Sequence, residues 1–106
     1  MTIITTPEEH DEAVALISHF PLIIAQALCA SIKNNKLAQE LASSGFKDTT
    51  RLALSNIEMA TDMVNLNKNN IINAMENLKN NFNSLINDSY KEKAEDIKDF
   101  RKKLYN

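Results

Sequence analysis

A single glycine, Gly45, stands among the 106 residues of this chain. Loops that cradle phosphate groups, such as the dinucleotide-binding G-x-G-x-x-G turn and the nucleotide-binding P-loop, need two or more glycines at fixed spacing. Neither loop can be built from this sequence. An all-β sandwich or barrel also needs frequent turn residues, whereas this chain has one glycine and two prolines. The scarcity of turn residues therefore argues against an all-β fold.

Charge and cysteine content argue against further classes of protein. Twelve Lys and Arg residues against fourteen Asp and Glu residues give a formal net charge of -2 and a pI near 5.6, so we expect no nucleic-acid partner. The one cysteine cannot form an internal disulfide, and the N-terminal segment has no basic stretch ahead of an apolar one, so we expect a cytoplasmic protein without a signal peptide.

Twenty consecutive residues, Ala13 to Ile32, carry no Asp, Glu, Lys or Arg. Such a run is long enough to cross a bilayer. Its alanines and polar residues make it weakly apolar for a membrane span, so we favour the central helix of a soluble bundle and no membrane partner. Pro21 removes one backbone hydrogen bond and is expected to kink this helix near Ile17 and Ser18 without necessarily ending it.

Capping residues predict where the helices begin. Thr6, followed by Pro7 and Glu9, is typical of a helix start. A short helix over 37–42 is expected to end near Gly45, which can adopt a left-handed conformation at low cost. The other expected caps are Asp48 for a segment through Ala53, Ser55 with Glu58, and Ser89 with Glu92.

Apolar residues at three- and four-residue spacing predict one long helix over about 56–87. Eleven of these residues are Asn, a poor helix former, so packing must hold the helix. Asn67 interrupts the apolar stripe, and a break at 67–70 is the alternative. A last helix over 90–104 has one apolar face, and its mixed charges indicate a solvated surface rather than an anion site.

Few residues in this sequence are candidates for metal ligands or reactive groups. His10 and His19 are nine positions apart, which places them on opposite faces of a regular helix, and no H-E-x-x-H motif occurs, so we expect no metal site. Cys29 is expected to be a small core residue. His19 lies beside Pro21 in an apolar helix and is either a hydrogen-bonded core histidine or part of a small polar cavity.

Besides His19, the segment 45–51 is a second place where polar and charged residues cluster. Lys47 and Arg51 are four residues apart, and helix-start amides are expected near Asp48, an arrangement that suits a carboxylate. The alternative is an ordinary capped turn with Arg51 paired to an acidic side chain. The residues alone leave both interpretations open.

Four segments together resemble, in order and spacing, the C-terminal helical domain of prephenate dehydrogenases. The resemblance covers about residues 7–86, and the combination of motifs is specific although each motif alone is weak. The segments are Glu-His-Asp at 9–11, Ser-His-Phe-Pro at 18–21, Gly-Phe-Lys-Asp-Thr-Thr-Arg-Leu-Ala at 45–53, and Glu-Met at 58–59 followed by Asp62.

This resemblance implies an all-α domain with a kinked central helix and a long partner helix, intertwined as a homodimer. In the family, the domain completes the substrate cleft of an NAD-dependent enzyme that oxidatively decarboxylates prephenate to 4-hydroxyphenylpyruvate in tyrosine biosynthesis. The residue corresponding to Arg51 binds a substrate carboxylate there. Those corresponding to Lys47 and Asp48 shape the same pocket, and that corresponding to His19 lies near it.

The sequence departs from the family pattern at three places. Leu22 stands where a second histidine is common, Ala60 stands where a tryptophan is common, and the glycine run before Phe46 is reduced to Gly45. The family's NAD-binding half, with its glycine loop and catalytic histidine, has no counterpart in this sequence. We therefore expect no catalytic residue, no cofactor and no turnover on this chain alone.

Residues 1–106 are accordingly predicted to form a single helical dimerisation and substrate-cleft domain. Its expected partners are a second copy of the chain, the NAD-binding half of the same enzyme and a prephenate-like carboxylate ligand. The alternative is a stand-alone helical homodimerisation module without catalytic activity.

Overall fold

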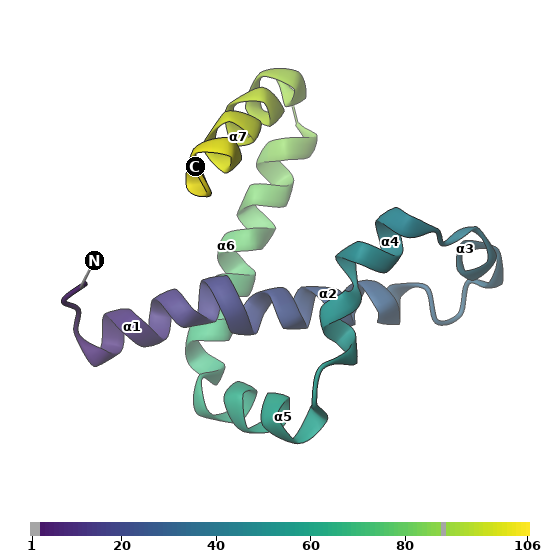
Figure 1. Ribbon diagram of the computed structural model, residues 1–106. Coiled ribbons are helices and arrows are strands. Elements are labelled where there is room, and N and C mark those ends of the chain that lie inside the picture. Colours follow the sequence, from purple (N-terminus) through teal and green to yellow (C-terminus); the bar gives the residue numbers. More distant parts are fainter. Residues whose placement is uncertain (1–2, 88) are drawn as a thin grey trace. The chain divides into compact units, whose positions relative to one another are not determined.

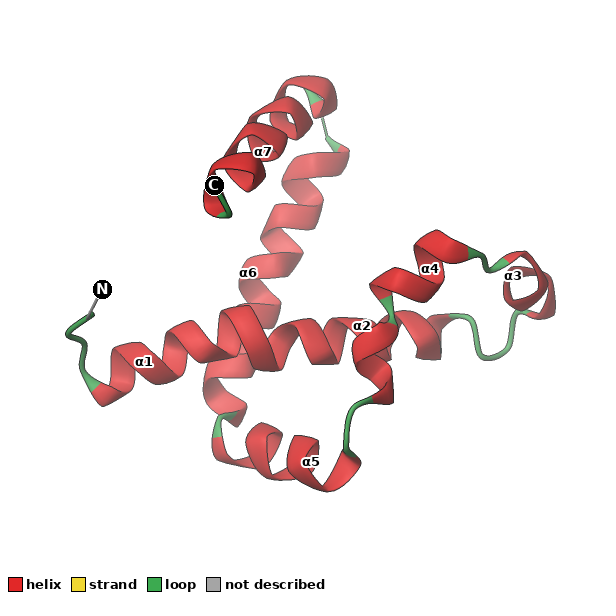
Figure 2. Cartoon of the chain, in the orientation of Figure 1, coloured by secondary structure: helices red, strands yellow, loops and turns green. Residues whose placement is uncertain are grey.

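The computed structural model describes residues 3–87 and 89–106. Within these ranges every regular element is helical and no strand occurs (Figure 2), which confirms the predicted all-α fold class. By its contacts the chain divides into two compact units, Met1–Ala74 and Met75–Asn106. Each unit is described by itself below.

The first unit is built on a continuous central helix made of α1 (Pro7–Val14), the π-helical segment η1 (Ala15–His19) and α2 (Phe20–Ser31) (Figure 1). The Thr6 hydroxyl oxygen accepts a hydrogen bond from the Glu9 amide at 3.1 Å, and the hydroxyl donates to the Glu9 carboxylate at 3.1 Å. These bonds satisfy a free amide of the first turn, which confirms the predicted helix start.

The helix is disturbed where Pro21 was expected to disturb it. Pro21 has no N–H to donate to the carbonyl one turn earlier, and the helix passes through the wider π turn of η1 before α2. The Phe20 amide accordingly bonds to the Ala15 carbonyl, and the helix continues. The combined helix, Pro7–Ser31, is long and apolar enough to cross a membrane, a criterion that core helices of soluble proteins also meet.

The core of the described residues is small. Its large side chains are Phe20, Leu22 and Ile71, which are 6%, 4% and 4% exposed. The other buried apolar residues are all alanines, whose small side chains allow close approach of helices: Ala15, Ala25, Ala60 and Ala74.

Two short helices follow the central helix, α3 (Lys36–Leu41) and α4 (Ser44–Thr49). The expectation of a left-handed Gly45 is wrong, because Gly45 lies in the first turn of α4 and has no positive φ. Ala42 and Ser43 adopt extended conformations instead, and these two residues connect α3 to α4 without a left-handed residue. Asp48 lies inside α4 and caps no helix.

Helix α5 (Ile57–Leu66) follows a 3-10 turn, η2 (Arg51–Leu54). The predicted capping box at Ser55 is wrong by one residue, since the Asn56 side chain accepts from the Met59 amide at 3.0 Å. The hydroxyl of Ser55 donates to the Leu52 carbonyl at 2.6 Å instead.

The single long helix predicted over 56–87 is also wrong, and the alternative break is correct. Helix α5 ends at Leu66, Asn67 leaves the helical conformation with φ -117° and ψ 24°, and α6 (Lys68–Ile86) begins after it. The Asn67 side chain makes its hydrogen bonds to the central helix. These contacts favour the break over a continuous helix.

The second unit contains the later part of α6 and helix α7 (Tyr90–Leu104). Ser89 precedes α7 in a left-handed conformation, φ 69°, and its side chain makes no capping bond. The predicted helix start is therefore right and the predicted capping box is wrong. Lys93 Nζ donates to the Ser84 carbonyl at 2.7 Å, which ties α7 to α6.

Candidate functional site

An apolar groove of about 320 Å³ lies in the first unit between the central helix, η2 and α5. Two of its lining residues, Leu22 and Ala60, are buried. No charged side chain lines it; the lining residues are Ser18, Leu22, Leu52, Ser55, Asn56, Met59, Ala60 and Met63. Such a groove can accept an apolar ring, and the charge of an anionic ligand must be met by residues at its margin.

The turn from α4 into η2 is anchored by two threonines. The hydroxyls of Thr49 and Thr50 donate to the carbonyls of Gly45 and Phe46 at 2.8 and 2.7 Å. Thr50 is 8% exposed and has its polar atoms satisfied in this way. The buried threonine thus holds the last turn of α4 in place, directly before Arg51.

Arg51 is the first residue of η2, and the next residue, Leu52, lines the groove. Lys47 and Asp48 lie on α4, and all three charged side chains are exposed. Within residues 3–87 and 89–106, no acidic side chain lies within ion-pair distance of Arg51, which disfavours the interpretation of a paired arginine. The expected free amides near Asp48 are wrong, because α4 begins one turn earlier at Ser44.

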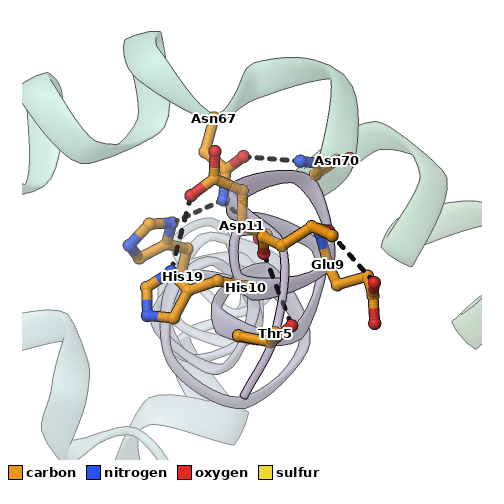
Figure 3. A network of polar contacts seen from close by, with 8 residues as sticks. Thr5, Glu9, His10, Asp11, His19, Asn67 and Asn70 are labelled. Atoms are coloured by element: carbon orange, nitrogen blue, oxygen red, sulfur yellow. Dashed lines mark hydrogen bonds and ion pairs between the residues drawn. The ribbon is translucent and has the colours of Figure 1, made fainter.

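His19 belongs to a polar cluster that joins the central helix to the α5–α6 break (Figure 3). Asn67 Nδ2 lies 2.9 Å from the Asp11 main-chain oxygen and 3.3 Å from His19 Nδ1. Asn70 Nδ2 donates to Asn67 Oδ1 at 2.8 Å. We refer to Asp11, His19, Asn67 and Asn70 as the Asn67 cluster. His19 is half-buried and hydrogen-bonded within it.

The prediction that His10 and His19 lie on opposite faces is wrong. Seen along the central helix, both rings lie on the same side (Figure 3), because the π turn of η1 advances the chain by a smaller angle per residue than an α-helix does. His10 Nδ1 is 3.6 Å from Asp11 Oδ1. No group of three metal-ligating side chains occurs in the part of the chain that the structure describes.

None of the four predicted site residues, His19, Lys47, Asp48 and Arg51, lines the groove itself. Ser18 and Leu52, which line the groove, are the chain neighbours of His19 and Arg51. Sequence reasoning missed the roles of Thr50 and Asn67. The interrupted apolar stripe at Asn67 was the available signal, whereas nothing in the sequence separated Thr50 from Thr49.

Taken together, these features define an all-helical domain with an apolar groove beside a turn that carries Lys47 and Arg51. The chain matches the family described as "Prephenate dehydrogenase, dimerization domain" over residues 6–104. It is 38% identical over 71 residues to the prephenate dehydrogenase of Bacillus subtilis (strain 168) and 32% identical over 87 residues to that of Lactococcus lactis subsp. cremoris (strain MG1363). These alignments cover 63% and 78% of this chain.

Two solved structures share the fold. Synechocystis arogenate dehydrogenase superposes with a TM-score of 0.70 at 31% identity, over 97% of this chain and 39% of its own. Prephenate dehydrogenase from A. aeolicus, in complex with hydroxyphenyl propionate and NAD+, gives a TM-score of 0.73 at 28% identity, over 99% of this chain and 38% of its own.

The chain belongs to the prephenate dehydrogenase dimerization domain family. The resemblance derived from the four sequence segments is thereby confirmed. The alignments span 19% and 25% of the two bacterial relatives' lengths, so the similarity concerns one helical part of those enzymes.

Proposed function

We propose that this chain is the dimerisation and substrate-cleft domain of an NAD-dependent prephenate dehydrogenase, which converts prephenate to 4-hydroxyphenylpyruvate for tyrosine synthesis in the cytoplasm. One observation carries the proposal: the apolar groove has Leu52 and Ser18 in its wall, so that Arg51 and His19 lie next to it in the chain. A relative with the same fold was solved with hydroxyphenyl propionate and NAD+, a ligand that combines a ring with a carboxylate.

Arg51 is proposed to bind the carboxylate of the ligand, because a guanidinium donates two parallel hydrogen bonds to a carboxylate. Lys47 and Asp48, one turn earlier, shape the charge around it. His19 is proposed to reach the ligand from the opposite, central-helix side. Leu22 and Ala60 supply apolar surface in place of a histidine and a tryptophan, so we expect weak binding to this chain alone.

A second copy of the chain is the proposed dimer partner. Large apolar side chains remain exposed in the described part of each unit, and surfaces of this kind mark association sites. In the first unit they include Ile17, Leu54 and Leu66, at 78%, 87% and 89% exposure. In the second unit Phe82 and Phe100 are 56% and 63% exposed.

The residues of this chain do not fit NAD, since it has one glycine and no phosphate-binding loop. We propose that a separate NAD-binding half supplies the cofactor site and the catalytic groups. The domain then acts by binding and orienting the substrate and by holding two subunits together.

The proposal is tested by replacing the helical domain of the Bacillus subtilis enzyme with this chain. We expect the fusion to form NADH from prephenate, while the NAD-binding half alone forms none, because the groove completes the substrate site. NADH absorbance measures the reaction. A folded, dimeric fusion without activity would favour the stand-alone homodimerisation module, an alternative that the uncharged groove lining supports.

A further inference from the structure

We propose that Asn67 is a positioning residue that holds the neutral imidazole of His19 in the tautomer with its proton on Nε2. The inference rests on the hydrogen bonds of the Asn67 cluster (Figure 3). Its consequence for a ligand rests on the proposed function, whereas the protonation pattern itself does not.

The first step is the orientation of the Asn67 amide. A main-chain carbonyl only accepts hydrogen bonds, and the Asp11 carbonyl oxygen lies 2.9 Å from one end of the Asn67 amide. That end must therefore be the NH2 group. The other end, Oδ1, accepts from Asn70 Nδ2 at 2.8 Å, which agrees with this orientation.

The second step concerns the imidazole of His19. The same Asn67 NH2 group lies 3.3 Å from His19 Nδ1, and it has a second hydrogen to donate. Nδ1 must then accept, because a protonated Nδ1 would place two N–H groups against each other. A neutral imidazole whose Nδ1 accepts carries its proton on Nε2.

The third step concerns the edge of the His19 ring that points away from Asn67. Nε2 lies on the edge of the ring away from Asn67 (Figure 3). His19 therefore offers an N–H donor on its outward edge and no proton-accepting nitrogen there. Toward a ligand in the adjacent groove, the residue would donate a hydrogen bond to a carboxylate or hydroxyl oxygen and would not act as a base.

The protonation pattern is measured by long-range ¹H–¹⁵N correlation spectra of the ¹⁵N-histidine-labelled chain, at a pH where His19 is neutral. We expect an unprotonated Nδ1 and a protonated Nε2. In Asn67→Asp the new carboxylate can only accept, so Nδ1 should gain a proton and its resonance should move to the protonated position. In Asn69→Asp, which adds the same charge at an exposed position of the same turn, the His19 spectrum should not change.

Two results would overturn the inference: a His19 that carries its proton on Nδ1 in the unaltered chain, or equal His19 spectra in the two Asp variants. If Asn67→Asp does not fold, Asn67→Ala provides the same test, because loss of the donor should raise the fraction of the Nδ1–H tautomer. Neither measurement needs ligand or activity. The spectra therefore test the His19 tautomer independently of the proposed enzyme function, and a negative result for one can be told apart from a negative result for the other.

Discussion

Replacing Arg51 by Ala is expected to lower kcat/KM for prephenate about ten- to a hundred-fold in the fusion with an NAD-binding half. The physical reason is loss of one charge-assisted hydrogen-bonded pair between guanidinium and carboxylate, about 1.5 to 3 kcal/mol. Arg51 begins η2 beside the groove, and no acidic partner is found for it in the described ranges. Its charge is thus available to a ligand, and steady-state kinetics of NADH formation measure the effect.

Two variants control this experiment. Arg51→Lys keeps the charge but loses the two parallel hydrogen bonds, so it should fall between the parent and Arg51→Ala. Arg101→Ala removes an arginine from α7, where the guanidinium stacks 4.3 Å from the Tyr105 ring centroid, and should leave kcat/KM unchanged. An unchanged kcat/KM in Arg51→Ala would show that Arg51 is not a substrate residue.

Phe20→Ala is expected to lower the free energy of unfolding by about 3 to 5 kcal/mol, the usual cost of truncating a buried phenylalanine. Phe20 is 6% exposed and begins α2 immediately after the π turn. In so small a core its aromatic ring supplies much of the buried apolar area. Urea unfolding monitored by circular dichroism, at one fixed protein concentration, measures the change.

Phe20→Leu keeps most of the apolar volume and should cost well under half as much. It also keeps the test informative if Phe20→Ala is too unstable to fold. The fixed concentration matters because a dimer gains stability by mass action. A loss below about 1 kcal/mol in Phe20→Ala would mean that the central helix does not bury this face.

Local sequence signals predicted the structure correctly where a residue type has a single structural effect on the backbone near it. Thr6 with Glu9 marked the first helix start, and Pro21 marked the disturbed turn of the central helix, because both act through a backbone amide nearby in sequence. Gly45 misled because a glycine permits a left-handed conformation without requiring it. Two extended residues before it, Ala42 and Ser43, make the connection between α3 and α4 instead.

Contacts across the fold set the remaining features. Asn67 breaks the helix through bonds to Asp11 and His19, 56 and 48 positions away in sequence, and no local pattern contains those partners. The predicted site residues could be selected by their resemblance to a family. The groove beside which Arg51 and His19 follow in the chain depends on how η2 and α5 pack on the central helix, which capping and periodicity do not determine.

The molar mass of the chain in solution shows directly whether it associates with itself. Light scattering across low to high micromolar concentrations should give twice the 11.9 kDa of one chain, because large apolar side chains exposed in both units favour association and a second copy is the proposed partner. A mass of 11.9 kDa at the highest concentration would show that this chain does not dimerise on its own.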